Sequence, residues 1–175
     1  MLMTAKPAIE KGLGIMIGAT QQLCEERDSM TQYLDTATGP EAAEIAKAFR
    51  EMTGDSLNTV FPQLHNRFER HLQSFDALCD NPERYTVEDV ETRFFSMRRD
   101  GERLAEEIAE GGPVQKAIQR TNDRLSETIA SDFSGLGAIQ TATFELQYVC
   151  RRVADNADYF VNYMSDAITA VATWK

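Results

Sequence analysis

Two histidines, His65 and His71 in the segment LHNRFERHLQ, have the side chains best suited to metal chemistry. Glu69 follows His65 by four residues, so both side chains would share one helix face and could supply two ligands to a metal ion. Di-iron bundles need Glu-x-x-His motifs, whereas proline and phenylalanine stand three residues before His65 and His71. His65 and Glu69 are therefore weak metal-ligand candidates, and the alternative is that both histidines border the core.

The sequence contains no recognisable catalytic motif. It has no G-x-S-x-G segment, and Cys24, Cys79 and Cys150 have no histidine close to them in the sequence. A nucleophile needs such a neighbouring base or another source of activation. We therefore expect no catalytic residue, no cofactor and no enzymatic activity.

Three glycines in the segment GLGIMIG, residues 12–18, miss the spacing of the dinucleotide-binding fingerprint by one residue, and no strand precedes them. The GLG triplet recurs at 135–137, where GLGAIQTATFEL matches GLGIMIGATQQL at six of twelve positions. Small residues on a helix allow a close approach of another helix. We expect the first and last helices to pack through Gly14 and Gly18 and through Gly137 and Thr141, within one chain or across a homodimer; the alternative is chance similarity.

Apolar residues recur every three or four positions along nearly the whole chain, and this spacing is typical of amphipathic helices. The longest patterns cover about residues 6–36 and 136–174. Interruptions are expected near residues 38–40, between Gly54 and Pro62, and at 79–86, 111–113 and 131–137. The sequence thus predicts an all-α, up-and-down bundle of four long, partly kinked antiparallel helices in five to six segments. Residues 1–175 are expected to form a single domain.

The chain is acidic, with a formal net charge of -10 and a pI of about 4.7, so direct nucleic-acid binding is not expected. Its longest apolar run is too short for a membrane span. Three widely spaced cysteines are typical of a reducing compartment, which predicts a cytoplasmic location. The acids that crowd one predicted helix could steer a basic partner, or could only solvate a helix face. These residues are Asp100, Glu102, Glu106, Glu107 and Glu110.

The last predicted helix is rich in aromatic residues. Phe160 falls on its apolar seam, while Tyr148, Tyr159 and Tyr163 lie partly off it. Exposed tyrosines are typical of protein interfaces, because they combine a large apolar area with a hydrogen-bonding group. Crowded packing inside a broad bundle is the alternative.

The sequence as a whole favours a non-catalytic protein of regulatory or adaptor type that binds another protein or itself, as in a homodimer. Two alternatives remain open. One is an acidic inhibitor or nucleic-acid mimic that blocks a basic partner, and the other is a bundle that holds a metal or a small ligand around His65 and Glu69.

Overall fold

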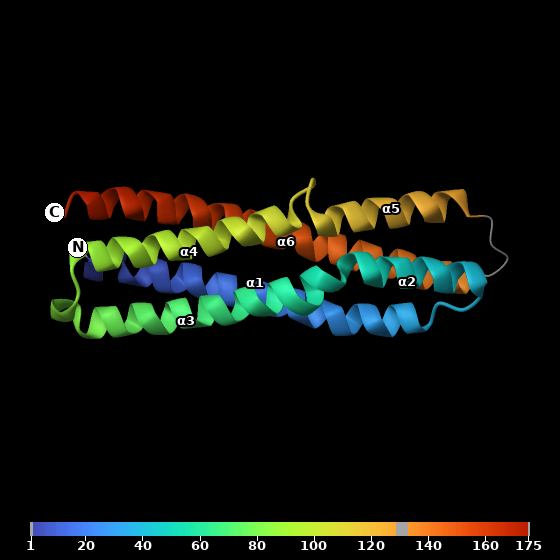
Figure 1. The fold of residues 1–175 in the computed structure, drawn as a ribbon, viewed down its shortest axis with the longest axis horizontal. Helices are drawn as coiled ribbons and strands as arrows, with labels where there is room; N and C mark the ends of the chain where they lie inside the picture. The colour runs from blue at the N-terminus through green and yellow to red at the C-terminus, as the bar shows by residue number, and fades with distance from the viewer. Residues whose placement is uncertain (1, 129–132, 175) are drawn as a thin grey trace.

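The computed structural model describes residues 2–128 and 133–174, which form helices and no strand. The helices are α1 (Leu2–Asp35), α2 (Pro40–Asp55), α3 (Phe61–Asp80), α4 (Val87–Ile108), α5 (Pro113–Glu127) and α6 (Phe133–Ala172), with a π-helical turn η1 (Ser56–Val60) and a 3-10 turn η2 (Pro82–Arg84). Figure 1 shows an elongated bundle in which α1 and α6 each run its length, α2 continues into α3, and α4 is followed in line by α5. The predicted all-α bundle is confirmed.

The bundle consists of four rods in chain order: α1, α2 with α3, α4 with α5, and α6. The second rod stays helical between Gly54 and Pro62, where the sequence predicts a break or kink. Pro40 occupies the first turn of α2, and Gly39 before it has φ 92°, a left-handed conformation that favours glycine. Pro62 has no N–H and crowds the carbonyl one turn earlier. The chain accommodates this by widening into η1, where the Phe61 N–H donates to the Ser56 carbonyl five residues back. A π turn therefore replaces the expected break.

The third rod is divided between α4 and α5, as residues 111–113 predict. A capping box starts α4: the Asp89 N–H donates to Thr86 Oγ1 at 3.1 Å, and the Thr86 N–H donates to Asp89 Oδ2 at 2.8 Å. Near the end of α4, Ser56 Oγ donates to Glu107 Oε1 at 2.6 Å. This bond holds η1 beside the break between α4 and α5.

The predicted turn at 131–137 lies partly outside the described residues. α6 begins at Phe133 and therefore includes Gly135 and Gly137 within its first turns. The residues that recur every three or four positions along the predicted apolar pattern 136–174 are buried. They are Leu136, Ile139, Thr143, Leu146, Cys150, Val153, Ala157, Phe160, Met164, Ile168 and Val171.

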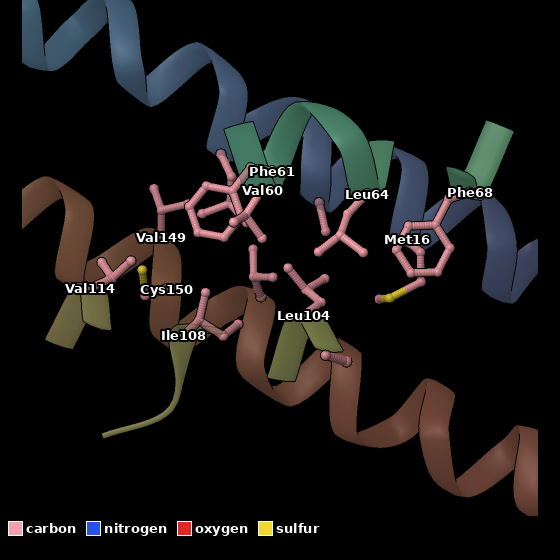
Figure 2. Close-up of a cluster of buried hydrophobic side chains, with 14 of the residues drawn as sticks. Met16, Val60, Phe61, Leu64, Phe68, Leu104, Ile108, Val114, Val149 and Cys150 are labelled. Carbon is pink, nitrogen blue, oxygen red and sulfur yellow. The ribbon is translucent and has the colours of Figure 1, made fainter. Parts of the chain in front are cut away.

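The core is a continuous apolar seam between the rods. Figure 2 shows side chains of α1, η1, α3, α4, α5 and α6 converging on it, among them Met16, Val60 and Leu104. Phe160 of α6 lies across the bundle from Phe68 of α3 in an edge-to-face contact, with ring centroids 5.8 Å apart. A Cβ added at Gly101 would stand 2.9 Å from the Phe160 ring, and one at Gly12 would stand 3.2 Å from it. These two glycines make room for Phe160.

The repeated segment occupies equivalent positions on α1 and α6. The prediction that these two helices pack through Gly14, Gly18, Gly137 and Thr141 is wrong for packing within one chain. Gly14, Gly18 and Gly137 have no atom within 4 Å of an added Cβ, and Thr141 is exposed. Their side of each helix faces away from the core. The close approaches instead involve the first glycine of each copy: Gly12, and also Gly135, where an added Cβ would stand 2.8 Å from the Thr38 carbonyl oxygen. Packing through Gly14, Gly18, Gly137 and Thr141 across a homodimer stays a prediction.

Alanine substitutions should separate the two kinds of glycine. Gly101→Ala should lower the free energy of unfolding by about 1 kcal/mol, because overpacking against Phe160 costs more than the gain in helix propensity. Gly14→Ala should raise it by about 0.5 to 1 kcal/mol, since its Cβ meets open space. Urea unfolding measures both changes, and equal shifts in the same direction would contradict the assignment.

Candidate functional site

The outward side of α6 carries large aromatic side chains. Phe144 is 71% exposed, Tyr148 is 55% exposed and Tyr159 is 68% exposed, while Tyr163 is half-buried. The structure therefore places Tyr148 and Tyr159 on the surface, as their position off the seam predicts, and Tyr163 at its margin. Phe144 is not among the interaction residues predicted from the sequence, although its spacing of four residues from Tyr148 indicates that both share one side of the helix.

Four charged residues lie between Tyr148 and Tyr159 in the sequence, and two of them, Arg152 and Asp155, share the side of α6 that carries the exposed aromatic residues. Arg152 and Asp155 are exposed, and neither forms an ion pair with another described residue. The Arg152 guanidinium lies 5.7 Å from the centroid of the Tyr148 ring, a cation-π contact that aligns it with the aromatic row. We call the surface formed by Phe144, Tyr148, Arg152, Asp155, Tyr159 and Tyr163 the α6 face.

The repeat shows that the fold does not require aromatic residues at these positions. Aligning the two GLG segments places Gln21 of α1 on Phe144 and Glu25 on Tyr148. Gln21 and Glu25 are exposed and bond to each other through Gln21 Nε2 and Glu25 Oε1 at 3.1 Å. Two helices with matching buried seams thus differ on the side that faces away from the core. Phe144 and Tyr148 therefore need an explanation other than folding.

Asp100 does not belong to an exposed acidic surface, which corrects the sequence prediction. It is 4% exposed and points towards α3, where Arg67 Nε donates to both carboxylate oxygens at 2.9 Å and His71 Nε2 lies 2.6 Å from Oδ2. Burial alone would raise the pKa of Asp100, but the hydrogen bonds and charges of His71 and Arg67 outweigh it and hold that pKa below its usual value. The three side chains form a structural ion-pair centre between α3 and α4.

The remaining acidic candidates are dispersed. Glu102 pairs with Arg98 at 3.5 Å, Glu107 accepts the bond from Ser56, and Glu106 and Glu110 are exposed. Basic residues interrupt the acidic run: an open cleft of about 280 Å³ beside Asp100 is lined by Arg67, Arg99 and Arg103 among others. The structure therefore does not bring the five predicted acids together on one surface.

His65 and Glu69 do lie side by side, with His65 Nε2 3.3 Å from Glu69 Oε1. The other ring nitrogen of His65 faces inward, 3.0 Å from Thr20 Oγ1 and 3.2 Å from the Ile17 carbonyl oxygen. Within residues 2–128 and 133–174, no group of three His, Cys, Asp or Glu side chains is placed to hold a metal ion. Through these contacts His65 links α3 to α1.

The thiols also lie on or beside the core. Cys79 and Cys150 are buried and Cys24 is half-buried, all as free thiols. Burial raises the pKa of the Cys150 thiol to about 12, which keeps it protonated at neutral pH and lowers its nucleophilicity.

An unfavourable carboxylate lies between α1 and α6. Glu26 Oε2 is buried without a hydrogen-bond partner, and burial, followed by the charges of Glu145 and Glu25, raises the pKa of Glu26. Glu145 itself accepts a bond from the Tyr33 hydroxyl at 3.1 Å. Ionised Glu26 therefore destabilises the fold.

Glu26→Gln should raise the free energy of unfolding at pH 7 by less than about 1 kcal/mol, because solvent partly screens the charge of this half-buried side chain. The folded-state pKa is raised, so the penalty develops as pH rises through the ordinary glutamate value of about 4.3. Thermal unfolding of both proteins from pH 3 to 8 measures the difference. A gain that persists at pH 3 would contradict this explanation.

Asp100→Asn should lower the free energy of unfolding at pH 7 by about 1 to 3 kcal/mol, because it removes the buried carboxylate that pairs with His71 and Arg67. The folded-state pKa of Asp100 is lowered, so its contribution is present above the ordinary aspartate value of about 3.9 and is lost as pH falls below it.

The control is Glu102→Gln on the exposed side of the same helix, which should change stability by less than about 0.5 kcal/mol. Urea unfolding at pH 7 and pH 3 tests both substitutions. Equal effects of the two at pH 7 would show that Asp100 is not a buried ion-pair centre.

Comparison with protein-family models, with curated proteins and with solved structures finds no match to this chain. Among the described residues, no helix has both the length and the apolar character that crossing a membrane demands.

Proposed function

We propose that this is a non-catalytic protein of regulatory or adaptor type, and that it acts by binding another protein through the α6 face. The observation that carries the proposal is the exposure of Phe144, Tyr148 and Tyr159 on one side of a helix whose repeat counterpart is polar there. Burial of aromatic area against a partner is favourable by roughly 25 cal/mol for each Å² removed from water. Tyrosine and arginine are also the residue types most often found as interface anchors.

The alternative of an acidic inhibitor has less support in the structure. Asp100 and Glu107 use their carboxylates inside the chain, and Glu102 is paired with Arg98. An inhibitor that mimics nucleic acid would need those charges free and aligned on one surface. We place the action of the protein in the cytoplasm, because its three cysteines are free thiols on or beside the core.

Site-specific photocrosslinking in the cells that produce the protein tests the proposal. A benzophenone amino acid is placed at Phe144 or Tyr159, and at Asn66 or Arg70 as controls, which are exposed on α3. The α6 positions should give a discrete covalent protein adduct, identified by mass spectrometry, and the α3 positions should not. No adduct from α6, or equal adducts from both helices, overturns the proposal.

Phe144→Gln combined with Tyr148→Glu copies the polar pair that α1 carries at the equivalent positions. With the crosslinker at Tyr159, this double variant should lose at least about nine-tenths of the adduct, because two aromatic anchors are removed. Its free energy of unfolding should stay within about 0.5 kcal/mol of the parent, since both side chains are exposed. Loss of adduct together with loss of folding would not support the proposal, so urea unfolding is the accompanying control.

A further inference from the structure

We propose that the protein bound at the α6 face is a second copy of this chain, packed antiparallel with a two-fold axis between residues 153 and 154. This inference rests on the proposed function and specifies its partner. It is carried by the order of residues along the face, by their charges and by the place of the face within α6.

Along the α6 face, two aromatic residues, two charged residues and two aromatic residues follow one another, so the order of residue classes is the same from either end. Two aromatic residues, Phe144 and Tyr148, are followed by Arg152 and Asp155, and then by Tyr159 and Tyr163. Successive spacings are four, four, three, four and four residues. At 1.5 Å per residue the face is about 29 Å long. A pattern symmetric about its middle is what an isologous two-fold interface needs, because each half must complement the other.

Antiparallel pairing about residues 153 and 154 matches every member of the face with a suitable residue of the second copy. Tyr148 would lie opposite Tyr159, Phe144 opposite Tyr163, and Arg152 opposite Asp155. Each of these pairs forms twice because of the symmetry. Aromatic side chains would thus meet aromatic side chains on both sides of two symmetric ion pairs.

The charges in the middle favour this orientation over a parallel one. Arg152 and Asp155 are exposed, and neither is engaged in an ion pair with another described residue. A parallel two-fold arrangement would set Arg152 opposite Arg152 and Asp155 opposite Asp155. Apposed like charges are costly at an interface, whereas the antiparallel order converts both into attractive contacts.

The location of the axis also suits the shape of the molecule. The point between residues 153 and 154 is close to the middle of α6 (Phe133–Ala172), and α6 runs the length of the bundle in Figure 1. Two elongated bundles paired there would lie side by side along most of their length. The second copy would then cover both aromatic ends of the α6 face, Phe144 with Tyr148 and Tyr159 with Tyr163.

The test is the solution mass of the purified chain, measured by light scattering and sedimentation from about 1 to 200 µM, with charge-reversal variants. The parent should reach twice the chain mass of 19.7 kDa. Arg152→Asp and Asp155→Arg should each weaken dimerisation at least about tenfold, because each creates two apposed like-charge pairs. The control Arg70→Asp makes the same charge change at an exposed residue of α3, a helix that packs against α1 and α4. This variant should dimerise like the parent.

Complementation makes the test specific to the antiparallel register. The double exchange R152D/D155R should recover the dimer, because it restores one acid and one base to the middle of each copy. An equimolar mixture of the two single variants should form a heterodimer, since positions 152 and 155 are both acidic in one variant and both basic in the other. Two proteins that are each monomeric alone cannot form such a heterodimer through misfolding. A dimer that tolerates the single reversals, or a mixture that stays monomeric, overturns the proposed register.

The outcomes for the partner and for the proposed function are distinguishable. A parent protein that is monomeric up to about 200 µM overturns the second copy as partner. If photocrosslinking from Phe144 or Tyr159 then yields an adduct with a different protein, the proposed function stands while this inference fails. If it yields none, both fail.

Discussion

Burial of one apolar seam along each rod is the constraint on which the rest of the structure depends. A bundle of this length has no sheet and no second layer among its described residues, so every helix must bury its seam against its neighbours. At the crowded centre, Phe160 of α6 packs between Gly12 of α1 and Gly101 of α4 and meets Phe68 of α3 edge-on. One phenylalanine therefore fixes how closely three other helices approach α6.

The same constraint explains how the bundle accommodates proline and glycine. Pro62 and the residues at 111–113 would each interrupt a seam, since proline cannot continue the hydrogen bonding of an α-helix. In one rod the chain widens into a π turn, and in the next it separates into α4 and α5. The Ser56 to Glu107 hydrogen bond joins these places. Two irregular segments at the same level disturb the core once, whereas irregularities at different levels would disturb it twice.

The fold was predictable from the sequence because helix periodicity and helix ends are local properties. The apolar seam predicted over residues 136–174 depends on spacings of three and four residues, and it is confirmed in α6. The Thr86 capping box likewise depends on a spacing of three residues. The ion-pair centre at Asp100 was not found, because its partners Arg67 and His71 come from another helix whose rotation about its axis no local spacing defines. The same ambiguity explains why the sequence predicts close packing at Gly14 and Gly18, whereas the structure has it at Gly12. A repeat shows that two segments are equivalent without showing which of their sides is buried.

The two copies of the repeat also separate what folding requires from what it leaves free. On their buried sides they agree, since Leu13 and Leu136 both lie in the core, as do Leu23 and Leu146. On their outward sides they differ, with Gln21 and Glu25 on α1 against Phe144 and Tyr148 on α6. Solvent favours the polar pair and opposes the aromatic pair, because exposed apolar area is unfavourable in water. An unfavourable surface on one of two equivalent helices is accounted for if a partner covers it, and the partner that we propose from the symmetric order of the α6 face is a second copy of the chain.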